Sequence, residues 1–111
     1  MGKLFIVPIH VKRMEKSIMP DEMSGGYVSC YADGIDYADA VKKCLDALKA
    51  DGLYPHEIMQ PILELDLKDW SRHVAEQWPA QVESLPNQGE FESKIKAGKV
   101  IYGPIGSYVD L

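Results

Sequence analysis

The chain lacks the features that mark several common classes of protein. Two cysteines in 111 residues are too few for a disulfide-rich scaffold. No apolar run approaches the ~18 residues that a membrane-spanning helix needs. Seventeen acidic residues outnumber twelve basic ones, and no basic stripe is present that would neutralise phosphates. We therefore expect neither a membrane-bound protein nor a nucleic-acid partner.

Signatures of metal and nucleotide sites are also missing. The two cysteines stand fourteen positions apart, and the histidines occur in no metal-ligand spacing: His10, His56 and His73. The segment 103–106, with the sequence Gly-Pro-Ile-Gly, lacks the lysine and the hydroxyl of a phosphate loop. We expect no metal and no cofactor.

Candidates for catalysis are few. Ser29 and Ser71 lack the Gly-x-Ser-x-Gly context of a hydrolase nucleophile. Asp69 and His73 are one helical turn apart, which suits either an acid/base pair or an ion pair on a solvated helix. The sequence leaves open whether the chain is an enzyme.

The N-terminal segment reads as a strand. From Gly2 to Val11 both faces of such a strand are apolar, which predicts burial on both sides or a subunit contact. Pro8 cannot donate to a ladder, which predicts an edge strand or a bulge. Pro8 and His10 interrupt the apolar run, so a strand explains it better than a signal peptide, and we expect a cytoplasmic protein.

A strand and a capped helix follow. Residues 27–32 alternate between small apolar side chains, which suit a helix, and the larger Tyr27 and Tyr31 on the other face. Asp36 is a good N-cap, and Gly52 ends a helix predicted over 37–51. Its apolar stripe consists of Val41, Cys44, Leu45 and Leu48. Cys30 and Cys44 should then face each other, either as reduced buried thiols or as a disulfide or redox pair.

The C-terminal half holds further elements. Pro61 in the apolar segment 58–65 predicts an edge strand, a bulge or two short strands. The remaining predicted elements are a helix over 67–78 capped by Asp66, a loop over 80–88, a helix over 90–97, a strand over 99–102, and a short extension or covering segment over 105–109.

These elements predict one α+β domain over residues 1–111. We expect a single mixed or antiparallel sheet of about four strands, with helices mainly on one face. The predicted order is β-β-α-β-α-α-β, which is partly ferredoxin-like.

Two groups of side chains are candidates for binding. The loop over 12–26 carries Met14, Met19 and Met23, which either fill gaps over the core or form an adaptable contact. Tyrosines of the sheet either rim the core or line a dimer interface or ligand floor. The candidate face consists of Tyr27, Tyr31, Tyr102, Met19, Met23 and His73, with Tyr108 and His10 as further members.

The run Gly26-Tyr27-Val28, followed by Asp36, Ala38 and Ala40, resembles the strand–helix segment of small HicB-type antitoxins. The resemblance covers about a quarter of the chain. The long loop before Tyr27 departs from the tight hairpin of that family, and we carry no function over from it.

Two functions therefore compete. The first is a noncatalytic protein-interaction module, homodimeric or immunity- or antitoxin-like, which binds a protein partner or a second copy of itself. The second is a small-ligand-binding protein or small enzyme with a cleft on the Tyr27 and Tyr31 face. We favour the first because no catalytic constellation is visible.

Overall fold

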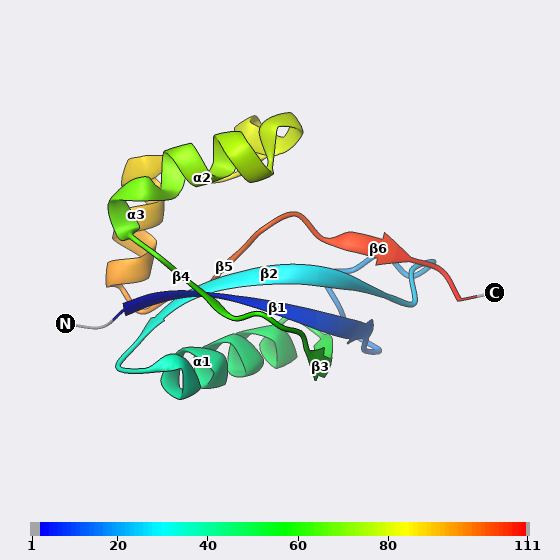
Figure 1. Cartoon of the computed structure of the whole chain (residues 1–111). Coiled ribbons are helices and arrows are strands. Elements are labelled where there is room, and N and C mark those ends of the chain that lie inside the picture. The colour runs from blue at the N-terminus through cyan, green and yellow to red at the C-terminus, as the bar shows by residue number, and fades with distance from the viewer. Residues whose placement is uncertain (1–2, 111) are drawn as a thin grey trace.

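A six-stranded antiparallel sheet forms the centre of the structure, a computed structural model that describes residues 3–110 (Figure 1). The fold is α+β. The strands are β1 (Lys3–Arg13), β2 (Gly25–Gly34), β3 (Leu53–Ile58), β4 (Leu63–Leu65), β5 (Ile101–Tyr102) and β6 (Gly106–Tyr108). β1 and β2 pair in the middle, β3 and β4 pair with β1, and β5 and β6 pair with β2. The predicted count of about four strands is not confirmed, because each edge is divided between two short strands.

Helices cover both faces of the sheet. α1 (Tyr37–Ala50) packs on one face, while α2 (Trp70–Gln77) and α3 (Gln88–Lys96) pack on the other (Figure 1). The prediction of helices mainly on one face is wrong, because the central strands carry large apolar residues on both sides. A ferredoxin-like order is not confirmed either, since β1 and β2 follow each other in the chain and lie side by side.

β1 contributes to two hydrophobic cores. Phe5, Val7, Ile9 and Val11 belong to the core under α1, and Leu4 and Ile6 belong to the core under α2 and α3. Alternate side chains of a strand point to opposite faces, so one strand can serve both cores. Burial on both sides, one of the two predicted alternatives, is confirmed. Gly2, the first residue of the predicted strand, lies outside the described residues.

Pro8 occupies a central strand rather than an edge. β4 pairs with β1 only as far as Ile6, and β3 pairs with it from Ile9 onward. The backbone N–H of Met59 donates to the Pro8 carbonyl at 2.8 Å. In an antiparallel ladder the N–H and C=O of one residue point to the same neighbour. The N–H that Pro8 lacks would therefore face the break between β3 and β4, where a donor is least needed.

α1 matches its prediction. The side chain of Asp36 accepts a hydrogen bond from the Asp39 N–H at 3.0 Å, and Asp39 Oδ2 accepts one from the Ile35 N–H at 3.1 Å. Gly52 ends the helix with a φ of 75°, and a Cβ at this position would collide with the backbone of Lys16. Only glycine satisfies both conditions.

The C-terminal half differs in detail. β3 begins at Leu53, earlier than predicted, and Pro61 lies in the break between β3 and β4, so the alternative of two short strands is correct. The predicted helix over 67–78 divides into a short 3₁₀ helix, η1 (Leu67–Asp69), and α2, and Asp66 makes no side-chain cap. The predicted loop over 80–88 begins inside a second 3₁₀ helix, η2 (Pro79–Ser84).

α3 begins two residues before its predicted start, because Asn87 and Glu90 form a reciprocal capping box. No helix within residues 3–110 is both long enough and apolar enough to cross a membrane.

Candidate interaction surface on the uncovered half of the sheet

α2 and α3 cover only part of their face of the sheet. They stand over the end where β1 begins, and in the described part of the chain no helix stands over the end where β1 finishes (Figure 1). Leu4 and Ile6 are buried beneath these helices, whereas Pro8, His10 and Lys12, on the same face, remain partly exposed. An uncovered sheet face with ring side chains is a natural place for a contact with another molecule.

Four ring side chains gather on this uncovered half, and we call them the aromatic cluster: His10, Tyr27, His56 and Tyr108. His10 stacks on Tyr27 with ring centroids 4.7 Å apart and meets His56 edge-on at 5.1 Å. Nε2 of His10 lies 2.6 Å from the Tyr108 hydroxyl oxygen. Because these contacts hold the rings in place, little conformational entropy would be lost when a partner binds to them.

The strand register explains how the aromatic cluster forms. His10 of β1 and Tyr27 of β2 are directly opposed in the antiparallel ladder. On the other side of β1, the ladder shifts between Val11, which pairs with Pro55, and His10, which pairs with Glu57. His56 is therefore the extra residue of a bulge, and bulges commonly redirect side chains near functional sites.

Tyr108 reaches His10 because Gly25 has no side chain. Gly25 is opposed to Tyr108 in the pairing of β2 and β6. A Cβ on Gly25 would lie 2.6 Å from the Tyr108 hydroxyl oxygen and 2.6 Å from the Val11 carbonyl oxygen. Any larger residue would have to displace the tyrosine or the backbone of β1.

Partial burial and the nearby charges favour a neutral His10. Partial burial, together with Lys12 and His56, lowers the pKa of His10, and Glu57 and Asp110 oppose this effect. The Lys12 ammonium lies 5.3 Å from the Tyr108 ring centroid, and the interaction with Tyr108 raises the pKa of Lys12. The cluster thus combines ring side chains with one cation and nearby carboxylates.

Tyr31 and His73 lie on the same sheet face as Tyr27 but in its covered half. Tyr31 is fully buried, and its hydroxyl oxygen accepts a hydrogen bond from Trp78 Nε1 at 3.2 Å. The same hydroxyl lies 2.7 Å from Nε2 of His73. Burial raises the pKa of Tyr31 and lowers that of His73. This network fastens α2 and the residue after it to the sheet, and Tyr31 is closed to a ligand.

Tyr102, Met19 and Met23 lie on the opposite face, with α1. The hydroxyl of Tyr102 donates to Asp51 Oδ2 at 2.6 Å. Met19 is buried in the core and Met23 packs against it, whereas Met14 is exposed. The candidate face predicted from the sequence is therefore divided between two sides of the sheet. Two members of the surface, Lys12 and His56, were not predicted. Pro55, directly before His56, is compatible with the bulge that positions His56 but does not by itself predict it.

Cys30 and Cys44 face each other, as predicted, and both are free and buried. The neighbouring Cys44 thiol and burial raise the pKa of the Cys30 thiol. Cys30 therefore remains protonated and unreactive, because the thiolate is the reactive form.

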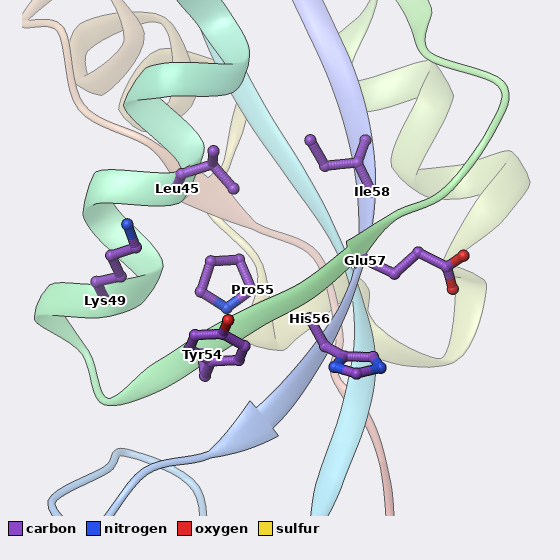
Figure 2. Close-up of a pocket in the computed structure, with 7 residues that line it drawn as sticks. All are labelled: Leu45, Lys49, Tyr54, Pro55, His56, Glu57 and Ile58. Atoms are coloured by element: carbon purple, nitrogen blue, oxygen red, sulfur yellow. The ribbon is translucent and has the colours of Figure 1, made fainter.

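A smaller and a larger cavity lie outside the aromatic cluster. Of the cluster residues, His56 lines the smaller cavity, and the larger cavity is lined by none of them. The smaller, about 330 Å³, lies between α1 and β3. Figure 2 shows Leu45 and Lys49 of α1 facing Pro55 and Ile58, while His56 and Glu57 extend to the side of β3 away from α1.

The larger cavity, about 830 Å³, lies at the other end of the sheet. Its apolar lining consists of Leu4, Leu65, Leu67 and Ile95, and charged side chains form its rim. Within residues 3–110, no group of three or more His, Cys, Asp or Glu side chains is arranged to hold a metal ion.

Comparison with known proteins adds no family: no family model, no curated protein and no solved structure matches the chain.

Proposed function

We propose that the chain is a noncatalytic protein-interaction module that binds its partner through the aromatic cluster. The observation that carries this proposal is the uncovered half-sheet, where ring side chains are held in place by one another. Tyr27 is 50% exposed although its ring stacks on His10. Exposed tyrosines on a rigid scaffold are typical of contact surfaces, because they offer large area at low entropic cost.

The exposed edge of the sheet extends this surface. Tyr54, Ile58, Met59 and Leu63 are all exposed along β3, β4 and the break between them. Pro55 and Pro61 interrupt the row of backbone donors there, which disfavours pairing with another strand. We therefore propose contact through side chains rather than addition of a strand.

We propose a cytoplasmic setting, because two buried reduced cysteines suit a reducing compartment. The net charge of −5 supports a protein rather than a nucleic acid as partner.

Site-directed photo-crosslinking tests the proposal. Benzoylphenylalanine replaces Tyr27 in one variant and Tyr37 in the control, a tyrosine with 62% exposure at the start of α1. Irradiation of cells that express each variant should give a discrete crosslinked species from position 27 and none from position 37. Equal crosslinking at both positions, or none at position 27, would contradict the proposal.

Ligand binding is a second candidate, favoured by the larger cavity. Its volume lies within the range of small-molecule sites, and its apolar floor with a charged rim suits an amphipathic ligand. A fragment screen by NMR tests this candidate. Binding that shifts the methyl signals of Leu67 and Ile95 would support it, and a screen with no such shifts would remove it.

A further inference from the structure

We propose that the partner on the aromatic cluster is a second copy of this chain, related by a twofold axis that passes between Lys12 and Glu57. This inference rests on the proposed function and specifies its partner. It follows from the charges that flank His10 and from the symmetry that a homodimer imposes.

Two charges of opposite sign lie next to His10. Lys12 follows His10 by two residues on the same face of β1, and Glu57 is the residue of β3 opposed to His10. Both are close enough to shift the pKa of His10, in opposite directions. Within residues 3–110, neither Lys12 nor Glu57 forms an ion pair.

A twofold interface uses the same patch on both subunits. If one residue of the first copy contacts a different residue of the second copy, the same contact occurs a second time with the two copies exchanged. An axis between Lys12 and Glu57 places Lys12 of each copy against Glu57 of the other. The patch is thereby complementary to itself, with two ion pairs around a centre of stacked rings. A partner of purely acidic or purely basic character would leave one of the two charges opposed by a like charge.

The same axis brings the imidazoles of two copies together. His10 and His56 of each chain, 5.1 Å apart, would lie near the axis, so four rings meet there. The groups that face His10 are Lys12 on β1, Tyr27 on β2, His56 and Glu57 on β3, Tyr108 on β6, and Asp110 beyond β6. Protonation of His10 in both copies would gather positive charge at the axis, and the dimer should dissociate in acid.

Sedimentation velocity on the purified chain, with charge reversals, tests this inference. The wild type should show a concentration-dependent dimer at about pH 7.5 that is lost at about pH 5. Lys12→Glu or Glu57→Lys alone should weaken the dimer by about tenfold or more, because each puts like charges in contact. The double variant Lys12→Glu/Glu57→Lys should restore it, since the two charges exchange places across the axis.

Matched controls use the exposed pair Lys42 and Asp46 on α1, whose ammonium and carboxylate lie 2.8 Å apart. Lys42→Glu and Asp46→Lys should leave the dimer unchanged. A wild type that is monomeric throughout, or a double variant that remains monomeric, would overturn the second-copy inference. If a monomeric chain still crosslinks from position 27 to a protein of different mass, the proposed function stands without the homodimer. If it crosslinks to nothing, both fall.

Discussion

The hydroxyl oxygen of Tyr108 lies 2.6 Å from Nε2 of His10, although 98 positions separate the two residues in the chain. Tyr108 belongs to β6, which pairs with β2, whereas His10 belongs to β1. The tyrosine side chain therefore crosses β2 above Gly25 to reach its partner. This contact joins the C-terminal strand to the centre of the aromatic cluster.

Gly25→Ala should disturb this contact. The added Cβ would lie 2.6 Å from both the Tyr108 hydroxyl oxygen and the Val11 carbonyl oxygen. We expect a loss of about 1–3 kcal/mol in the free energy of unfolding, as for other overpacked sites. Urea denaturation measures the loss, and the ring signals of His10 report the displaced tyrosine.

Gly89→Ala is the control for Gly25→Ala. Gly89 lies in α3, where a Cβ would lie 3.6 Å from Asn87 Oδ1. Since alanine favours a helix, this variant should be as stable as the wild type or up to about 1 kcal/mol more stable. A Gly25→Ala variant with unchanged stability and unchanged His10 signals would show that the packing above Gly25 is loose.

Tyr31→Phe should weaken the attachment of α2 to the sheet. The substitution removes the acceptor of the Trp78 indole N–H and the hydrogen-bond partner of His73. Leaving such groups without a partner costs about 1–3 kcal/mol. Tyr27→Phe, at a half-exposed position, should change stability by less than about 0.5 kcal/mol. Equal effects of the two variants in chemical denaturation would contradict the proposed network.

Lowering the pH should reduce the free energy of unfolding of the monomer even at pH values higher than those at which carboxylates titrate. The folded protein lowers the pKa of His10 and His73 from 6.5, so the unfolded chain binds more protons in the interval below that value. The free energy of unfolding should therefore fall as the pH decreases through 6.5 toward the lower folded pKa values, and level off below them. Chemical denaturation between about pH 7.5 and about pH 5, on samples dilute enough to be monomeric, measures this slope.

His73→Gln identifies one source of the slope. Glutamine does not titrate, so this variant should show a shallower pH dependence than the wild type, whatever its absolute stability. His56→Gln, which removes an exposed imidazole, is the matched control. An unchanged slope in His73→Gln would mean that burial beneath α2 does not hold this imidazole neutral.

Cys30 and Cys44 should resist thiol reagents in the folded state. Both are fully buried, and the neighbouring Cys44 thiol and burial raise the pKa of the Cys30 thiol. A chromogenic disulfide reagent should label neither cysteine in native buffer and both in denaturant without reductant. Fewer than two thiols in denaturant would show that the pair had been oxidised.

The local parts of the fold follow from sequence patterns. Asp36, Gly52 and the apolar stripe of α1 predict its limits to within one residue, because caps and helical periodicity are local signals. The prediction that Cys30 and Cys44 face each other follows from the alternation along the strand and the helical spacing along α1. The division of each edge into two short strands was only partly predictable. Pro61 lies in the break on one side and Pro104 in the break on the other, but a proline is compatible with an edge strand or a bulge as well as with a break.

The candidate surface could not be derived in the same way. That Tyr27 and Tyr31 share a face follows from alternation along β2. Which of the two tyrosines is covered depends on where α2 packs on the sheet. That position is set by contacts between residues far apart in the sequence, such as Tyr31 and Trp78. The placement of Tyr102 with α1 depends on the pairing of β5 with β2. His56 depends on a bulge in β3 that only the tertiary register reveals.

The dual role of β1 has a consequence for how the protein loses its structure. Because neighbouring residues such as Phe5 and Ile6 belong to different cores, neither layer of helices can separate from β1 without exposing the strand that supports the other. The two layers should open as one cooperative unit rather than as independent halves. The backbone amides of β1 would then exchange with solvent only when the whole molecule unfolds, while residues at the edges of the sheet exchange earlier.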